Sequence, residues 1–515
     1  MANIDRTTFA LYLHRGTSVK NSGIRYMTNT EVVIGIDVGT TFIKAVVLDR
    51  SGHEVYSSSQ RTFVDTIRSG WNEQDPKDWW SSSCNALKDI TSNVNPNNIK
   101  AIGLSGQMHS PAFLDIQDQI IRPSILWNDV RTSLECEQIY NSLDLSTLET
   151  VIGNPILEGF TAPKLLWLKN NESDNFEKLS TFLIAKDYIA FMLTGEKSTE
   201  PSDASGTVLM DLNTRDWSKE VIESLDLQHL SFPTIHKSAE TVGKVSTQAS
   251  QLTGLLAGTP VIAGGADNAA AAISTGSISE NVCQISLGTS GAVVQTTTKP
   301  VVDPNLRLHT FSHCIEDRWY SMGVTLSAGG SLSWFADKIV GTSAFHDLDE
   351  EARLVSPGSD GLVFLPYLNG ERTPHNNPNI RGAFLRIDSS HTKGHMIRSI
   401  MEGVAFSIRD VVELMETLMS PAEIFVVTGG GTNSALWSQI LADVIGKNLS
   451  KVMTNSGPSY GAALIAAVNA GWFQDIEEAV QEYVTLSEYI TSSTEHSSFY
   501  EENYRYYKHS YENLK

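Results

Sequence analysis

The chain has 515 residues, too many for one hydrophobic core, which predicts two domains with a cleft between them. Its formal charge of −21 argues against DNA or RNA as a partner, because binding to a phosphate backbone relies on clustered Lys and Arg. No apolar run approaches the roughly 20 residues of a membrane span, so we expect a cytoplasmic protein without membrane contact. The four cysteines lack the short spacings of zinc sites and predict reduced, partly buried thiols.

Residues 1–30 form a basic leader that is poor in acidic side chains, and apolar periodicity begins only at Glu31. An organellar targeting peptide has this composition, but the leader lacks the long apolar segment of a secretory signal. We expect Met27 to be the functional start and the preceding residues to be a disordered or non-native extension.

The first domain is predicted to open with three antiparallel strands joined by short turns. An apolar run at residues 32–37 ends in Asp37, and a Gly-Thr turn follows at residues 38–41. Apolar residues resume at 42–48, before a turn at 49–52 leads into the third strand.

The opening pattern returns near the middle of the chain. Residues 285–290 (ISLGTS) align with residues 36–41 (IDVGTT), about 250 residues earlier. This repeat predicts two domains of like topology, which we place at residues 31–275 and 276–515.

Strand-like and helix-like stretches alternate along both halves, which is typical of layered α/β domains. The last helix, residues 499–511, carries Tyr at i, i+4, i+7 and i+11, a spacing that predicts a packing face rather than a ligand site. Further strands are predicted at residues 100–104, 260–263 and 424–427, a further helix at 435–445, and residues 165–168 are predicted to lie inside a helix.

Asp37 is a candidate metal residue, because its carboxylate projects where a buried strand meets a turn with free N–H groups. Hydrated Mg²⁺ prefers one or two carboxylates together with substrate phosphates. The alternative is an aspartate that caps its own turn.

Asp267 is a candidate general base. It follows two glycines at the end of a predicted strand and precedes an alanine-rich helix. An aspartate at such a position is otherwise a helix N-cap. Asn268 adds an amide that can bind a polyol hydroxyl.

Two glycine-rich turns are candidate nucleotide sites. Residues 287–291 (LGTSG) let the backbone approach a phosphate, the alternative being a plain hairpin turn. Residues 426–434 (VVTGGGTNS) offer a glycine surface on which adenine or ribose can rest. The second turn is not a dinucleotide-binding motif, because Ser434 takes the third glycine position and no acidic residue follows about 20 residues later.

A sugar site needs hydroxyl partners beside an apolar wall, and residues 104–109 (LSGQMH) supply both at the end of a predicted strand. Trp127 adds an aromatic face, and Asn128, Asp129 and Arg131 are further polar side chains that could line the same pocket.

In chain order, these segments resemble the carbohydrate kinases named for their FGGY signature, from about residue 32 to residue 471. The resemblance implies an α/β fold of two ribonuclease H-like domains, similar to actin and hexokinase, that flank a deep catalytic cleft. Within the family, the longer runs are most similar to members that use ATP and Mg²⁺ to phosphorylate D-xylulose at its C5 hydroxyl. These runs are GQMH at 106–109, LWND at 126–129, SDASGT at 202–207, LSAGGS at 326–331 and GERTPH at 370–375.

The resemblance implies that Asp267 is the catalytic base and that Asp37 acts near Mg²⁺ through a water. We expect the sugar to be bound by Gln107, Met108, His109, Trp127, Asp267 and Asn268. We expect the nucleotide to be bound by Gly39, Thr40, Thr41, Gly288, Thr289, Ser290, Gly329, Gly429, Gly430, Gly431 and Asn433.

One departure from the family is Ser110, where many members have Gly, and we expect it to narrow the sugar pocket. A homodimer is common in the family. The alternatives are a related kinase acting on gluconate, glycerol or ribulose, a nicotinamide dehydrogenase, and a non-catalytic protein that binds nucleotide or sugar.

Overall fold

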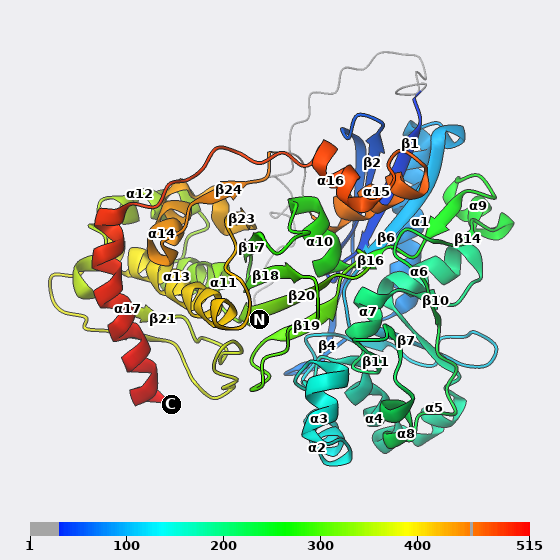
Figure 1. The fold of residues 1–515 in the computed structure, drawn as a ribbon, viewed down its shortest axis with the longest axis horizontal. Coiled ribbons are helices and arrows are strands. Elements are labelled where there is room, and N and C mark those ends of the chain that lie inside the picture. Colours follow the sequence, from blue (N-terminus) through cyan, green and yellow to red (C-terminus); the bar gives the residue numbers. More distant parts are fainter. Residues whose placement is uncertain (1–29, 454–456) are drawn as a thin grey trace, which may run out of the picture.

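The computed structural model describes residues 30–453 and 457–515, so the predicted extension and Met27 lie outside the described residues. Figure 1 shows two α/β parts side by side, one around the strands at the start of the chain and one around β17, β18 and β20. None of the helices in these ranges combines the length and the apolar character that a membrane crossing requires.

The first sheet opens with three antiparallel strands, as predicted, and then adds parallel strands beside β1. Its order is β14-β15-β6-β1-β2-β3, and β16 also pairs with β6. The strands are β1 (Val32–Val38), β2 (Phe42–Asp49), β3 (Glu54–Arg61), β6 (Ile99–Gly106), β14 (Thr241–Lys244), β15 (Pro260–Ile262) and β16 (Gly265–Ala266).

The second sheet repeats this arrangement. Its order is β19-β20-β18-β17-β23-β24, with β17, β18 and β20 antiparallel and β23 and β24 parallel to β17. The matching order confirms the repeat at residues 285–290 and the ribonuclease H-like fold. The strands are β17 (Val282–Leu287), β18 (Gly291–Thr297), β19 (His309–Ser312), β20 (Trp319–Thr325), β23 (Ile424–Thr428) and β24 (Leu449–Lys451).

Helices cover both sheets and bury their apolar faces against them. In the first domain, α1 and α6 pack beside β2, β3 and β6, and in the second domain α13 packs along α14 and the sheet. The bounds are α1 (Pro76–Asn93), α6 (Ala185–Thr194), α9 (Thr247–Thr253), α10 (Asp267–Thr275), α11 (Gly329–Trp334), α12 (Phe345–Arg353), α13 (Lys393–Leu418) and α14 (Ala435–Ile445).

An insertion between β6 and β14 forms the lower right of Figure 1. Its helices are α2 (Ser133–Ser142), α3 (Leu145–Thr147), α4 (Thr161–Asn171), α5 (Ser173–Lys178), α7 (Pro201–Ser205) and α8 (Lys219–Ser224). Its short strands are β7 (Pro111–Leu114), β8 (Ser124–Ile125), β9 (Thr181–Ile184), β10 (Ser198–Thr199), β11 (Met210–Asp211), β12 (Asp216–Trp217) and β13 (Thr234–Ile235). The hairpin β4 (Asp65–Arg68) and β5 (Trp71–Gln74) joins them through β8.

Late in the chain, α15 (Pro458–Asn469) returns to the first sheet and packs against β1, β6 and α10. The approach is so close that a Cβ on Gly35 would lie 2.0 Å from the Ser459 carbonyl oxygen, and one on Gly461 would lie 1.9 Å from that of Ala270. The domain boundary between residues 275 and 276 stays a prediction, because α15, from the second half of the chain, packs on the first sheet. The following helix α16 (Ile476–Tyr483) packs on α15 and α10.

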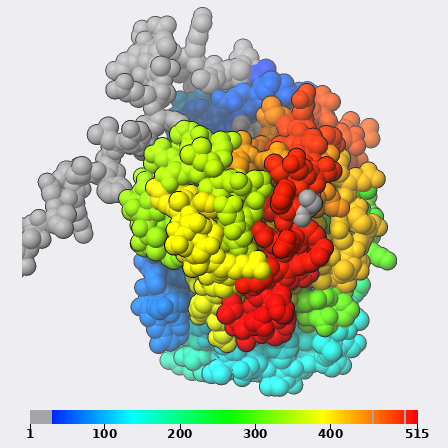
Figure 2. Space-filling model, turned by 90° about the vertical axis from the view of Figure 1, so that its left-hand side faces the viewer, coloured from blue at the N-terminus to red at the C-terminus, as the bar shows by residue number. Residues whose placement is uncertain are grey.

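The C-terminal helix α17 (Thr494–Leu514) lies across one face of the second domain, where it is the red ridge in Figure 2. Its tyrosine stripe is buried in the core of that domain, which confirms the predicted packing face. The stripe consists of Tyr500, Tyr504, Tyr507 and Tyr511. The four cysteines are free and buried.

Candidate active site

The two candidate carboxylates lie at one edge of the first sheet. Asp37 pairs with Ser105 on β6, and Ser105 in turn pairs with Gly265 on β16, so three parallel strands end side by side. Asp267 follows β16 directly, as the first residue of α10. The carboxyl ends of parallel strands are where α/β folds place their ligands.

Burial raises the pKa of Asp37 to about 7, and the charge of Asp267 adds to that rise. Burial also raises the pKa of Asp267, to about 6, against hydrogen bonds from Asn268 that lower it. The Oδ1 atom of Asp37 is buried and has no hydrogen-bond partner among the described residues. Because both pKa values lie near neutrality, the pair carries fewer than two full negative charges at pH 7, and a cation or a cation-bound water at the free oxygen would favour the ionised forms.

Asp267 is not the N-cap of α10. That position belongs to Ala266, and no side chain caps this helix end. One carboxylate oxygen of Asp267 accepts from the backbone N–H of Asn268 at 2.7 Å and from its side-chain amide at 2.9 Å. This leaves the second oxygen without a partner among the described residues, as a general base requires.

Asp267 borders a cavity of about 280 Å³ between the two domains, together with four of the five other predicted sugar-binding residues. The first domain contributes Met108, His109, Trp127, Leu157, Gly159, Phe160, Asp267 and Asn268. The second domain contributes Ser290, Gly291, Ala292, Met322, Val324, Leu326 and Arg372. Both walls combine apolar side chains with a few polar groups, a mixture that suits a small polyol.

His109 has a left-handed backbone (φ 66°), and a hydrogen bond from its imidazole ring holds the side chain in place. Its Nδ1 lies 2.6 Å from the Gly206 carbonyl oxygen, so Nδ1 carries the proton and Nε2 is an acceptor. Burial lowers the pKa of His109 to about 3, helped by the charge of Lys164. The ring is therefore neutral at physiological pH, and its Nε2 can accept a hydrogen bond from a sugar hydroxyl.

Gln107 is the predicted sugar residue that does not line the cavity. It is buried, and its Oε1 accepts from the Thr40 hydroxyl at 2.9 Å while its Nε2 donates to Gln74 at 3.0 Å. The indole N–H of Trp127 donates to the same Thr40 hydroxyl at 3.0 Å. Gln107 and Thr40 thus hold the Trp127 ring in place, and direct contacts from either to a ligand stay predictions.

Two expectations about the loop around Trp127 are corrected. Ser110 does not narrow the pocket: it is buried, and its hydroxyl accepts from the Trp127 backbone N–H at 3.1 Å. Asp129 and Arg131 are also absent from the cavity wall. They pair with each other at 2.7 Å, and Arg131 pairs with Glu73 at 2.6 Å, which anchors the loop.

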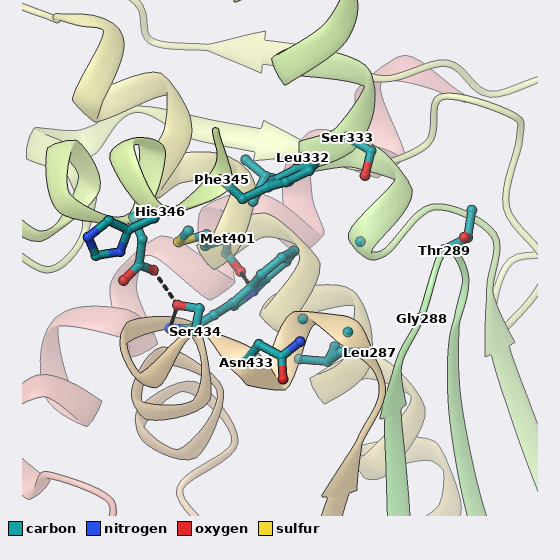
Figure 3. Close-up of a pocket in the computed structure, with 15 residues that line it drawn as sticks. Leu287, Gly288, Thr289, Leu332, Ser333, Phe345, His346, Met401, Asn433 and Ser434 are labelled. Atoms are coloured by element: carbon teal, nitrogen blue, oxygen red, sulfur yellow. Dashed lines mark hydrogen bonds between the residues drawn. The ribbon is translucent and has the colours of Figure 1, made fainter. Parts of the chain in front are cut away.

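A larger pocket of about 650 Å³ lies within the second domain (Figure 3). Leu332 and Phe345 cover one side and face Asn433 and Ser434 on the other. The Ser434 hydroxyl donates to the carboxylate of Asp349. Six predicted nucleotide residues line the pocket: Gly288, Thr289, Gly329, Gly430, Gly431 and Asn433.

The turn after β17 separates the two spaces. Thr289 lines the larger pocket, whereas the next residue, Ser290, lines the sugar cavity. The turn is held by Ala328, whose N–H donates to the Thr289 carbonyl oxygen at 2.9 Å, and by Gly329, whose N–H donates to the Gly288 carbonyl oxygen at 2.7 Å. One short turn with glycines thus separates the two cavities.

The remaining predicted nucleotide residues lie outside both linings. Gly39, Thr40 and Thr41 form the turn between β1 and β2, beside Asp37. Gly429 has a positive φ of 89° and packs behind the turn, where an added Cβ would lie 2.6 Å from the Leu287 carbonyl carbon. Their contacts with nucleotide stay predictions.

Several pocket residues carried no signal in the sequence. They come from α11, α12, α13 and α14, whose apolar periodicity indicates only a packed helix, and the fold alone turns these side chains to the pocket. They are Leu332, Ser333, Phe345, His346, Asp349, Met401 and Trp437.

Comparison with known proteins agrees with this architecture. Residues 32–274 match the N-terminal domain, and residues 283–470 the C-terminal domain, of the FGGY family of carbohydrate kinases. The chain belongs to this family and is therefore a phosphotransferase, with ATP implied as the co-substrate.

The chain is 36% identical over 485 residues to a xylulose kinase of Bacillus subtilis (strain 168). The matched region covers 94% of this chain and 97% of that relative. A solved ligand-bound xylulose kinase from Lactobacillus acidophilus is 26% identical with a TM-score of 0.89, covering 94% of this chain and 98% of that one. A solved gluconate kinase from the same organism gives the same four values.

Proposed function

We propose that the protein transfers the γ-phosphoryl group of ATP to the C5 hydroxyl of D-xylulose, giving D-xylulose 5-phosphate. The observation that carries this proposal is the turn at residues 288–290, which borders a nucleotide-sized pocket on one side and a sugar-sized cavity with Asp267 on the other. The name of the Bacillus subtilis relative supports D-xylulose as the acceptor.

Asp267 is proposed as the general base. Its free carboxylate oxygen accepts the proton of the attacking hydroxyl, and its raised pKa, about 6, lies near the working pH, where a general base is most effective. Asn268 orients the carboxylate through two hydrogen bonds. Phosphoryl transfer otherwise depends on positioning and electrostatics, which the residues lining the two cavities would provide.

Asp37 is proposed to hold Mg²⁺ through a water. The residues present fit this ion, because Asp37 has a buried oxygen without a partner and Mg²⁺ needs few protein ligands when it is bound to substrate phosphates. The bound ion would neutralise charge on the phosphates. It would also offset the repulsion between Asp37 and Asp267.

Gluconate is the second candidate acceptor, because the solved gluconate kinase is as similar to this chain as the solved xylulose kinase. Glycerol and ribulose complete the panel. A coupled assay of ATP consumption, with the product identified by mass spectrometry, measures kcat/KM for each acceptor. A kcat/KM for gluconate, glycerol or ribulose above that for D-xylulose would overturn the proposal.

The cytoplasmic location and the homodimer also remain proposals. Cell fractionation tests the first. Sedimentation velocity of the purified protein tests the second.

A further inference from the structure

Arg372 is the single cation among the described residues that line the sugar cavity. It belongs to the second domain, in the loop that follows β21 (Val363–Leu365). The other side chains that this domain adds to the wall are apolar or small, apart from the hydroxyl of Ser290. Arg372 is thus the one strong hydrogen-bond donor that faces the cavity from the second domain.

The loop around Arg372 is fixed to β20. Glu371 accepts from the Leu326 N–H at 2.9 Å, from the Arg372 N–H at 2.8 Å and from the Thr325 hydroxyl at 2.6 Å. On the other side, the Thr373 backbone N–H donates to the Val324 carbonyl oxygen at 2.9 Å. These bonds hold the backbone of Arg372 on both sides. They also engage the carboxylate of the neighbouring Glu371 with donors other than the Arg372 guanidinium.

The guanidinium of Arg372 has no hydrogen-bond or ion-pair partner in the part of the chain that the structure describes. By contrast, Arg131 pairs with Asp129 and Glu73, and Arg398 pairs with Glu402, whereas Arg372 is half-buried at the cavity wall. A guanidinium carries five N–H donors, and leaving them unsatisfied away from bulk water costs free energy. The chain therefore leaves these donors free for oxygen atoms of a ligand.

The charge of Arg372 acts across the cavity. Burial lowers the pKa of Arg372, and Glu158, in the loop of the first domain before α4, is the first of the charges that oppose this shift. Burial lowers the pKa of His309 far below its usual range, with Arg372 as the next cause. Arg372 is also among the charges that lower the pKa of His109. Arg372 and His109 line the same cavity, and these effects agree with that placement.

We propose that Arg372 is a substrate-binding residue, which donates hydrogen bonds from the second domain to oxygen atoms of the acceptor sugar opposite His109. This inference rests on the proposed function. The sugar site is then complete only when both domains enclose the acceptor, because Asp267 and His109 come from one domain and Arg372 from the other.

The test compares Arg372→Met and Arg372→Lys with the wild type and with Arg381→Met, a control in a nearby loop whose guanidinium donates to the Pro378 and Ile380 carbonyl oxygens. Loss of hydrogen bonds to a charged donor predicts a KM for the acceptor raised about 10- to 150-fold in Arg372→Met, with the KM for ATP and the Tm unchanged. Calorimetric titration of the acceptor without ATP should show the same loss of affinity. The acceptor KM of Arg372→Lys should fall between those of the wild type and Arg372→Met. Arg381→Met should behave as the wild type.

Two results would overturn the inference. A reduced kcat with unchanged acceptor KM and affinity would assign Arg372 to the phosphoryl group, and unchanged kinetics would leave it no role in binding. If Arg372→Met does not fold, Arg372→Ala with added guanidinium ion gives the same decision, since the free ion should restore the acceptor KM. If the wild type does not phosphorylate D-xylulose, only the proposed function is contradicted. The Arg372 variants are then compared with the wild type on the acceptor that the wild type does phosphorylate.

Discussion

Asp37 and Asp267 lie at one edge of the first sheet, and after burial it is the charge of Asp267 that raises the pKa of Asp37, to about 7. The two groups come from opposite ends of the first domain. Two carboxylates in one site repel each other when both are ionised. In the proposed mechanism, a divalent cation bound by Asp37 and the substrate phosphates would offset this repulsion, so the pair would favour Mg²⁺–ATP over the empty site.

Asp267→Asn should lower kcat by about 10²- to 10⁴-fold, the usual loss for a general base. The amide keeps the shape of the side chain and its oxygen can still accept from Asn268, so the Tm and the acceptor affinity should stay close to those of the wild type. Steady-state kinetics, calorimetry and thermal unfolding measure the three quantities. Asp115→Asn, in a turn of the insertion, is the matched control, and a kcat above about a tenth of the wild-type value would remove Asp267 from this role.

The pH dependence of kcat/KM should report the same pair. Both carboxylates must be ionised in the free enzyme, so activity should fall as the pH drops through about 7 and about 6, the raised pKa values of Asp37 and Asp267. Because the groups interact, the two steps belong to the pair rather than to single residues. A profile between pH 5 and pH 8.5 checks this, and a flat acid limb down to pH 5 would contradict it.

Asp37→Asn should stabilise the fold at pH 8 while it lowers activity. The pKa of Asp37 rises from 3.8 to about 7 on folding, so between these values the folded state holds a proton that the unfolded state has lost. Its contribution to stability is therefore present at low pH and is lost as the pH rises through about 7. The amide has no such loss, and the Tm should rise by about 2–4 °C for each kcal/mol regained.

Thermal unfolding of Asp37→Asn and wild type at pH 5 and pH 8 measures this difference. The gain should be larger at pH 8. Asp49→Asn, at the end of β2 on the protein surface, is the control that should show no gain at pH 8. An equal or lower Tm for Asp37→Asn at pH 8 would show that the buried charge costs the fold nothing.

Gly430→Val should raise the KM for ATP without loss of stability. A Cβ at Gly430 meets no atom within 4 Å, and the residue lines the larger pocket, so the new side chain occupies ligand space. Gly429→Val is the contrast, because its φ of 89° and its contact with Leu287 make any side chain strained. The first variant should keep its Tm and the second should lose several degrees, and an unchanged KM for ATP in Gly430→Val would place the nucleotide elsewhere.

The strands and the two glycine turns could be predicted from sequence because they depend on local rules. Alternating or continuous apolar residues mark buried strands, and glycine marks the turns that follow them. The run at residues 36–41 and its copy at 285–290 also predicted the repeated topology. Helix α14 was predicted with its bounds, since apolar residues follow a serine that caps it and a glycine ends it.

Which residues meet in one cavity depended on the tertiary structure. Gln107, Ser110 and Arg131 follow the same strand ends as Met108 and Trp127, yet their hydrogen bonds turn them into supports for the site. Adjacent residues of one turn, Thr289 and Ser290, lie in different cavities. Sequence spacing cannot separate these cases, because the direction of a side chain is set by partners far along the chain.

The sequence by itself determined the fold class and the repeat and predicted the two candidate carboxylates, because each depends on a few residues that are close together in the chain. The packing of the two domains decided how the sugar cavity is closed. Asp267 and Arg372 line one cavity only after both domains have formed and packed together, so the complete site exists in the folded molecule alone.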